Sequence, residues 1–323
     1  MSRQSGEPLT FAVEEVERKT RLLPGGRTRL LIGGQAVIEG VMMRSPQWTS
    51  TAVRRPDGAI RAVTEPHASL LLHFRWLRVP VLRGCVALYE SLTIGIKALL
   101  LSAGMASGEP ASVGGRQVAA TVSVGVGVAL GLFFLLPAAV IRSLDVYFPT
   151  ALASNLAEGA LRVLILLGYI VGIGRLPNVA RIFAYHGAEH KAVNTYEAGA
   201  PLRAETARGF SRFHVRCGTS FLLIVMIMAI VVFSFLGRPP LVLRLASRTA
   251  FLPLIAGLSY ELIRLAARFS WFRPVVVPGL WLQRLTTREP DERQIEVALQ
   301  ALREVVERED ASPSSGPSPE AIS

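Results

Sequence analysis

The sequence predicts a membrane α-helical protein with about four transmembrane helices, a small N-terminal cytoplasmic β-rich unit and a C-terminal amphipathic helix. Three observations predict this class. Of the 323 residues, 50% are hydrophobic and only 18% are charged, whereas soluble domains carry about 25% charged residues. The hydrophobic residues gather in runs long enough to cross a bilayer, which takes about 20 residues. Short segments with glycine turns precede these runs, and a periodic polar helix follows them.

The chain begins with a polar segment, residues 1–28, that has mixed charge and no apolar periodicity. We expect a flexible tail there, and not a signal peptide, because the segment lacks an apolar core and a cleavage site.

Residues 29–66 are expected to form the β-rich unit. Gly33, Gly34 and Gly40 interrupt short apolar runs, which predicts strands that meet at tight glycine turns. A hairpin is predicted over residues 49–65, because the intervening Pro56-Asp57-Gly58 suits a turn.

Residues 67–116 are expected to form interfacial helices and a linker. Pro80 should break the first helix. Charged residues recur among the apolar ones as far as Lys97, which favours a helix lying in the membrane interface. A helix half inserted over residues 86–101 stays open as an alternative, and residues 102–115 read as a linker of small residues.

The transmembrane domain is expected over residues 117–267, with a cytoplasmic loop at 175–218. Positively charged residues are concentrated in cytoplasmic segments of membrane proteins. Loop 175–218 has seven, and the segments at both ends of the chain are basic as well. We therefore expect a multi-pass protein of the cell (inner or plasma) membrane with both termini in the cytoplasm, although Arg238, Arg244 and Arg248 then fall in an external loop. The predicted spans are 118–141, 160–176, 219–236 and 249–267.

A C-terminal cytoplasmic segment is expected over residues 268–308. Pro274 and Pro278 prevent a simple continuation of the last span, and an acidic helix start follows at residues 289–292. The stripe of Ile295, Ala298, Leu299, Leu302 and either Val305 or Val306 predicts a helix that docks on another surface of the protein. Residues 309–323 are expected to be disordered.

The candidate site lies in loop 175–218, where His186, Glu189 and His190 fit the pattern H-x-x-E-H. Two histidines four residues apart share one face of a helix, so both rings can reach one metal ion. Glu189 could then serve as the general base that acts on water.

His214 and Cys217 are the natural completion of this site, since both side chains suit zinc. Three ligands would leave an open position for catalysis, whereas four would make a structural site. Asn194 and Glu197 extend the same helix stripe, but Glu197 lies seven residues beyond His190, or about 10 Å along a helix. We therefore assign both to supporting roles.

The alternative interpretation of this loop is structural. Histidines near a membrane often only bond to the backbone or to headgroups, and Cys217 could merely begin a span. Glu261 is a further candidate ligand, but with Arg264 three residues later an interfacial ion pair is the simpler interpretation.

Four motifs together resemble the YqhQ-like family of uncharacterised bacterial membrane proteins. They are GGQAVIEGVMMR, YHGAEHKAVNTYEAG, RFHVRCGTSF and LQRLTTREPDERQIEVALQAL, and they span about residues 30–305. The resemblance implies a metal-dependent enzyme without an established reaction. It makes the histidines, Glu189 and Cys217 motif positions, and it adds Gln35, Glu39 and Arg44. Val215 departs from the family pattern, which has proline there.

Two functions follow from these observations. The first is a zinc-dependent hydrolase at the cytoplasmic membrane face. The second is a non-catalytic scaffold or transport-associated protein with a structural metal or a histidine cluster. We expect no charge pair deep among the apolar helices, which argues against a proton-coupled transporter. The expected partners are the lipid bilayer, a membrane-protein or lipid-linked substrate and a second copy of the chain. The net charge of +11 is scattered, so we expect no nucleic acid.

Overall fold

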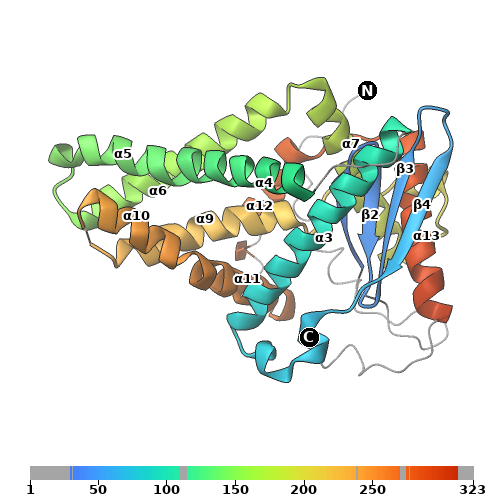
Figure 1. Ribbon diagram of the computed structural model, residues 1–323, viewed down its shortest axis with the longest axis horizontal. Helices are drawn as coiled ribbons and strands as arrows, with labels where there is room; N and C mark the ends of the chain where they lie inside the picture. The colour runs from blue at the N-terminus through green and yellow to red at the C-terminus, as the bar shows by residue number, and fades with distance from the viewer. Residues whose placement is uncertain are drawn as a thin grey trace.

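The computed structural model describes residues 30, 32–108, 115–237, 239–269, 274–275 and 277–311. The predicted tail at residues 1–28 and residues 312–323 of the predicted disordered tail lie outside these residues. The prediction of disorder is wrong for residues 309–311, which are helical. Figure 1 shows two halves, a bundle of long helices on the left and a sheet with its covering helices on the right.

The β-rich unit is confirmed as a four-stranded antiparallel sheet with the strand order β1-β2-β3-β4. The predicted hairpin joins β3 to β4 at Pro56-Asp57-Gly58, and Gly58 adopts a φ of 85° there. The strands are β1 (Gly33–Val37), β2 (Gly40–Arg44), β3 (Trp48–Arg54) and β4 (Ile60–Pro66).

The turn between β1 and β2 differs from the prediction. Gly33 and Gly34 lie within β1, and the residue with a left-handed backbone is Glu39, at a φ of 52°. Gly40 serves a different need, because a Cβ there would lie 2.1 Å from the Ala52 carbonyl oxygen. Glycine at this position therefore lets β2 approach β3 closely, and it is not needed for the turn.

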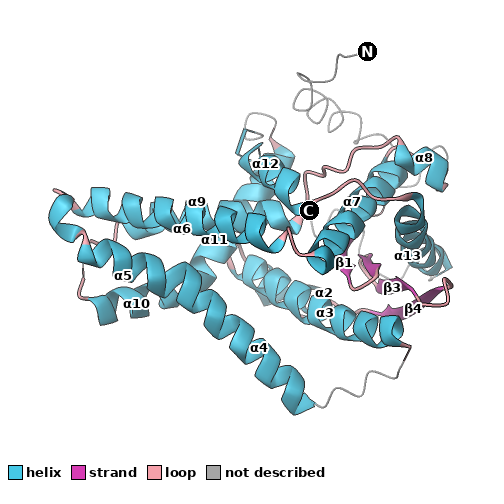
Figure 2. Cartoon of the chain, turned by 90° about the horizontal axis from the view of Figure 1, so that it is seen from above, coloured by secondary structure: helices cyan, strands magenta, loops and turns pink. Residues whose placement is uncertain are grey.

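Helices cover both faces of the sheet. On one face Val41 and Met43 pack against α7 (Pro177–Glu197) and α13 (Glu292–Ala311), while α8 (Ala204–Arg208) packs beside them. On the other face Met42 packs against Ala98 of α3 (Leu82–Ser107). Successive residues of a strand point to opposite faces, so β2 is buried on both (Figure 2).

The predicted C-terminal amphipathic helix is confirmed as α13. Its stripe, including Ile295, Leu299 and Leu302, is buried against the sheet and α7. The helix extends to Ala311, three residues beyond the predicted 308.

The segment after the sheet is more helical than predicted. The chain forms α2 (Leu70–His73) and a 3₁₀ turn, η1 (Arg75–Arg78), and breaks at Pro80 as expected. Then α3 runs without interruption for 26 residues and is apolar enough to cross a membrane. Residues 102–107, predicted to belong to the linker, are therefore part of this helix. Whether the helix lies in the membrane interface or is inserted stays a prediction.

Among the described residues, three helices are long and apolar enough to span a membrane, namely α3, 116–143 and 151–173, or four if a bent pair counts as one, while α9 is shorter than these. The predicted spans appear as 116–143, 151–173, the 17-residue α9 and a pair bent by 41° at Phe251. The bundle consists of α4 (Gly115–Leu130), the π-helix η2 (Gly131–Leu135), α5 (Leu136–Ser143), η3 (Asp145–Tyr147), α6 (Ala151–Ile173), α9 (Gly218–Ser234), α10 (Leu241–Ala250), α11 (Leu252–Arg268) and α12 (Val277–Thr286).

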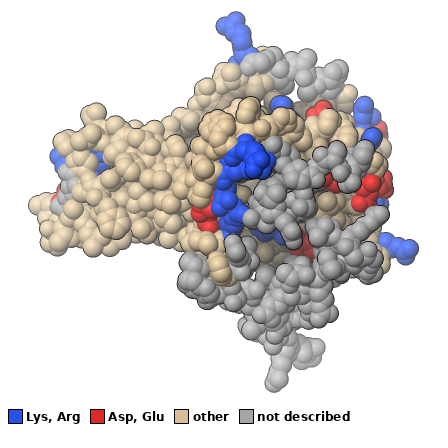
Figure 3. Space-filling model, turned by 90° about the horizontal axis from the view of Figure 1, so that it is seen from below, with Lys and Arg blue, Asp and Glu red and all other residues tan. Residues whose placement is uncertain are grey.

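On the face shown in Figure 3, the bundle has few charged side chains away from its far end, whereas the sheet half carries many. Large apolar side chains point outward along the bundle, among them Val124 at 66% exposed and Leu164 at 65%. Such a surface is typical of a protein that contacts lipid or a partner.

Two charge pairs correct the sequence predictions. Glu261 pairs with Arg83 of α3 through two hydrogen bonds, and not with Arg264. The expectation of no buried charge pair among the apolar helices is also wrong, since Glu158 and Arg162 of α6 are buried and 2.8 Å apart.

Candidate functional site

The predicted helix through H-x-x-E-H is α7, which starts at Pro177 and packs against β1, β2 and α13. Proline suits this first position, because its missing N–H would have no partner within the helix. The second half of α7 is almost entirely buried. His186 and His190 lie one turn apart on it, with ring centroids separated by 4.4 Å.

A backbone carbonyl fixes the ring of His186. Its Nδ1 lies 2.8 Å from the carbonyl oxygen of Thr286, at the end of α12. A carbonyl can only accept, so Nδ1 donates and Nε2 retains its lone pair. This Nε2 lies 3.2 Å from the Sγ of Cys217.

The ring of His190 is fixed in the same way. Its Nδ1 lies 2.6 Å from the carbonyl oxygen of Arg212, so its Nε2 also carries the lone pair. This Nε2 is buried and has no hydrogen-bond partner among the described residues. Buried polar atoms are nearly always satisfied, so a buried nitrogen left without a partner is free to act as a metal ligand.

Cys217 completes the group as the N-cap of α9, where the helix dipole favours a negative charge. Its Sγ accepts from Thr219 N at 3.4 Å and lies 3.0 Å from Thr219 Oγ1. One ligand atom from each of His186, His190 and Cys217 lies within 4.8 Å of the others. We call these three residues the His-His-Cys group.

His214 lies beside this group but is engaged elsewhere. Its ring centroid is 5.8 Å from that of His190. Its Nε2 lies 3.4 Å from a carboxylate oxygen of Glu197, and its Nδ1 accepts from Arg216 N at 3.4 Å. Burial lowers the pKa of His214 to about 4, although Glu197 partly opposes this shift. A neutral ring with both nitrogens bonded positions the chain and does not add a fourth ligand.

Residues 208–216, which we call the strap, are held on α7 by side chains one turn apart. Lys191 Nζ donates to the Arg208 and Phe210 carbonyls, both at 2.8 Å. Asn194 donates to the Ser211 and Phe213 carbonyls at 2.8 and 3.0 Å, and Glu197 pairs with Arg216. The structure thus places Asn194 and Glu197 in supporting positions, since the strap supplies the carbonyl that fixes His190.

Glu189 faces the sheet. Its side chain is buried so closely against β1 that a Cβ on Gly34 would lie 2.7 Å from Glu189 Cγ. Burial raises the pKa of Glu189 to about 7, and the nearby His186 partly opposes the shift. Glu189 is therefore next to the His-His-Cys group in sequence and electrostatically coupled to it, without belonging to it.

The three N-terminal motif residues lie outside the His-His-Cys group and join the sheet to helices. Gln35 touches α3, where a Cβ on Gly95 would lie 2.3 Å from its Oε1. Glu39 pairs with Arg181 of α7. Arg44 contacts two partners, Glu90 of α3 at 3.0 Å and His67 Nε2 at 2.8 Å.

Sequence reasoning missed residues of the second and fourth motifs. Gln283 accepts from His214 N at 2.9 Å and donates to His214 O at 2.8 Å, so it secures the end of the strap. Gly187 lets the segment after α12 approach α7, because a Cβ there would lie 2.2 Å from the Arg288 carbonyl. The motif RLTTREP marks this segment in the sequence. It does not reveal that the backbone carbonyl of Thr286 is the group that fixes the His186 ring.

This arrangement suits zinc. Two neutral imidazoles and a thiolate are ligands that zinc prefers, and three protein ligands leave one position open. The Nδ1–H bonds to carbonyls provide the second layer of contacts that orients histidine ligands in metal sites.

Comparisons with known proteins place the chain in a family. Residues 79–308 match the family described as "Protein of unknown function (DUF1385)", and this range contains the His-His-Cys group and its carbonyl partners but not the sheet. The chain is also similar to the "Uncharacterized protein YqhQ" of Bacillus subtilis (strain 168), with 33% identity over 296 residues, which cover 86% of this chain and 92% of the relative. No solved structure matches. The chain therefore belongs to the DUF1385 family and is similar to YqhQ over most of its length.

Proposed function

We propose that the chain is an integral membrane metalloprotein whose metal centre lies between the helix bundle and the sheet half. The bundle would span the bilayer, and the sheet, α7 and α13 would lie in the cytoplasm. The lengths of the apolar helices and the outward apolar side chains support this arrangement. So do the basic residues of loop 175–218, which favour the cytoplasmic side.

The membrane assignment predicts that alkaline carbonate will not extract the protein from membranes. A protease added to right-side-out vesicles should leave a C-terminal tag intact, and the same protease should remove the tag in inverted vesicles. Release by carbonate would contradict insertion, and the reverse pattern of cleavage would contradict the orientation.

One observation carries the metal proposal. Two histidine Nε2 lone pairs, each fixed by a carbonyl on the opposite nitrogen, converge with the thiol of Cys217 inside 4.8 Å. His190 Nε2 is buried without a partner. A zinc-class divalent cation would accept all three ligand atoms, and no rearrangement of the strap is needed to expose them.

We propose a hydrolytic role for this centre, acting on a membrane peptide or a lipid-linked molecule. A zinc ion held there would polarise the substrate carbonyl or phosphoryl group and acidify water. His186, His190 and Cys217 would hold the ion. Glu189, whose side chain packs against β1, would have to turn toward the ion to accept the proton from water. The junction with the bundle would give access to substrates that reside in the membrane.

The metal proposal is tested by the metal content of the protein purified in detergent without chelator. Wild type should retain close to one zinc per chain, and His190→Ala should lose most of it. His73→Ala is a matched control, since His73 is exposed and bonds only to the Ser69 carbonyl among the described residues. Equal metal content in all three proteins, or none in wild type, would refute the proposal.

A structural zinc is the second candidate, and one observation favours it. The group joins four chain segments, namely α7, the strap, the start of α9 and the end of α12, with His190 and Cys217 buried. Cobalt substitution separates the two roles without knowledge of the substrate. An added hydroxamate should change the visible spectrum of the cobalt protein if the fourth position is open, and leave it unchanged if the site is closed. Glu189→Gln should retain the metal in both cases, because Glu189 is not a ligand.

A further inference from the structure

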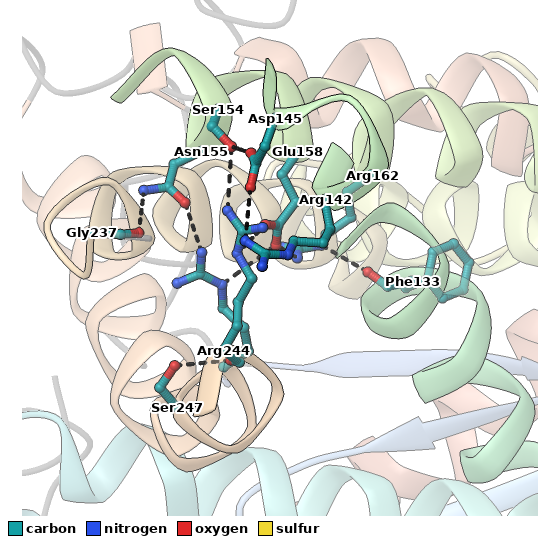
Figure 4. Close-up of polar contacts among 11 residues, drawn as sticks. Phe133, Arg142, Asp145, Ser154, Asn155, Glu158, Arg162, Gly237, Arg244 and Ser247 are labelled. Atoms are coloured by element: carbon teal, nitrogen blue, oxygen red, sulfur yellow. Dashed lines mark hydrogen bonds and ion pairs between the residues drawn. The ribbon is translucent and has the colours of Figure 1, made fainter. Parts of the chain in front are cut away.

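Three arginine side chains are buried at the end of the bundle farthest from the sheet. Arg162, Arg244 and Arg248 are each 1% exposed, and all three contact Glu158, which is equally buried. Figure 4 shows Arg162 and Arg244 beside Glu158. We call these four residues the arginine cluster. Fully buried arginines are rare unless they are paired, so the partners of this cluster determine what it can bind.

Two helices supply the cluster. Glu158 and Arg162 lie one turn apart on α6, and Arg244 and Arg248 lie one turn apart on α10. Residues four apart share a helix face, so both pairs point into the same space. Glu158 lies 2.8 Å from Arg162, 3.3 Å from Arg244 and 3.4 Å from Arg248.

The charges of the cluster do not balance. Three guanidinium groups surround one carboxylate, which leaves two positive charges in excess. Asp145 is the nearest further acid and binds Ser154 at 2.6 Å, but the exposed Arg142 pairs with it. Among the described residues, the excess therefore has no counter-charge, and burying uncompensated charge is costly.

Some donors of the cluster are also free. Arg248 donates through Nη2 to Asn155 at 2.8 Å, but its Nη1 is buried with no hydrogen-bond partner in the part of the chain that is described. Arg244 Nε likewise makes no hydrogen bond, despite its ion pair with Glu158. Arg244 Nε lies 3.3 Å from Glu158 Oε2, which is also buried without a hydrogen bond, so these two atoms can satisfy each other. Guanidinium nitrogens cannot act as acceptors, so Arg248 Nη1 needs an acceptor from outside the described residues.

The surroundings hold the guanidinium groups in fixed planes. Phe233 packs under Arg248 at 4.2 Å and under Arg162 at 5.3 Å, measured from the guanidinium carbon to the ring centroid. Arg162 Nε donates at 2.7 Å to the Phe133 carbonyl in the π-helix η2. Phe233 thus covers one face of the Arg248 guanidinium, so its free N–H group is open to an acceptor in the guanidinium plane, which is the geometry of bidentate oxyanion recognition.

We propose that the arginine cluster binds the phosphate group of an anionic ligand. A phosphate offers several acceptor oxygens and enough negative charge to offset the excess. The cluster is also far from the His-His-Cys group, since Phe233 is 16 residues beyond Cys217, or about 24 Å along α9. A membrane phospholipid headgroup and a soluble phosphate both provide this chemistry.

Thermal unfolding of the full chain in neutral detergent tests the site. The probes are inorganic phosphate, dihexanoyl-phosphatidylglycerol and dihexanoyl-phosphatidylcholine, with sodium chloride at matched ionic strength. Stabilisation by phosphatidylglycerol but not by free phosphate supports a lipid ligand, and stabilisation by both supports a site open to water. A wild type that responds to neither, or that responds equally to phosphatidylcholine and phosphatidylglycerol, overturns the proposal.

Variants locate the binding. Arg248→Gln should weaken binding of the active probe by roughly 10- to 100-fold, as expected for lost hydrogen bonds to a charged group. Arg142→Gln, at the same end of the bundle but half exposed, should bind like wild type. If Arg248→Gln does not fold, Arg248→Lys keeps the charge but loses the planar fork, and should still bind at least several-fold more weakly. Equal loss in the Arg142 and Arg248 variants would indicate non-specific attraction and overturn the proposal.

Discussion

The His-His-Cys group and the arginine cluster lie near opposite ends of α9, and both are buried polar sites in an otherwise apolar setting. In the first, the unpaired atom is His190 Nε2, an acceptor. In the second, the unpaired atom is Arg248 Nη1, a donor. The first group consists of two imidazole rings and one cysteine side chain, while the second has two positive charges in excess.

Because of this difference, the ligands that would complete the two sites carry opposite charges. A site of converging lone pairs accepts a cation, whereas a site of converging N–H groups accepts an anion. The supports differ as well, since backbone carbonyls orient the histidines and aromatic rings orient the guanidiniums. The two sites should therefore respond independently to mutation, because residues more than about 10 Å apart without shared partners behave additively.

Removal of the central acid should have the largest effect on stability. Glu158→Gln leaves three buried arginines around a neutral amide, and breaking a buried pair costs about 3–5 kcal/mol. Chemical denaturation in mixed micelles measures this loss. Zinc content should not change, and a parallel loss of zinc from the folded variant would show that the two ends are coupled.

Gly187→Ala should damage the other end. Its Cβ would meet the Arg288 carbonyl at 2.2 Å, and such overpacking costs about 1–3 kcal/mol. The displaced segment also carries the Thr286 carbonyl, so zinc content should fall in the same sample. Gly127→Ala is the control, because a Cβ at Gly127 meets nothing within 4 Å. Equal stability and equal zinc content in the Gly187 and Gly127 variants would refute the proposed role of close packing at Gly187.

Asn194→Ala should weaken zinc binding without changing a ligand. The substitution frees the two strap carbonyls on either side of Arg212, whose own carbonyl orients His190. Loss of such outer contacts typically costs 10–100-fold in metal affinity, measured here by competition with a chromogenic chelator. Unchanged affinity would mean that the strap holds its position without Asn194.

Arg142→Gln should have the smallest effect. The Arg142 side chain is 51% exposed and lies 3.4 Å from Asp145, and exposed pairs contribute about 0–1 kcal/mol. If Arg142→Gln lowered the free energy of unfolding as much as Glu158→Gln, Arg142 would belong to the arginine cluster, and its positive charge would add to the excess.

The parts that could be predicted from sequence are those that depend on local spacing. The hairpin at Pro56-Asp57-Gly58, the stripe of α13 and the shared face of His186 and His190 all follow from periods of two or 3.6 residues. The carbonyls of Thr286 and Arg212 could not be predicted, because backbone groups have no sequence signature. The left-handed backbone of Glu39 in the turn between β1 and β2 also could not be predicted, since the nearby glycines are the more usual turn residues.

The arginine cluster escaped prediction for another reason. The predicted topology places Arg244 and Arg248 in an external loop, where positive charges disagree with the predicted orientation. In the structure α10 folds back, so that both side chains point inward. Their four-residue spacing was visible in the sequence, as was that of Glu158 and Arg162. Spacing along the chain does not show that α6 faces α10. The sequence therefore could not show that the pair on α6 contacts the pair on α10.

The shortness of α9 has a consequence for the surrounding lipid. Its 17 residues span about 25 Å, less than the roughly 30 Å of a typical hydrocarbon core. In the proposed arrangement this hydrophobic mismatch would be relieved by local thinning of the bilayer around α9. Thinning would draw the headgroups toward Cys217 and bring ester and phosphate linkages of membrane molecules to the depth of the metal centre, so that a substrate need not leave the membrane to reach it.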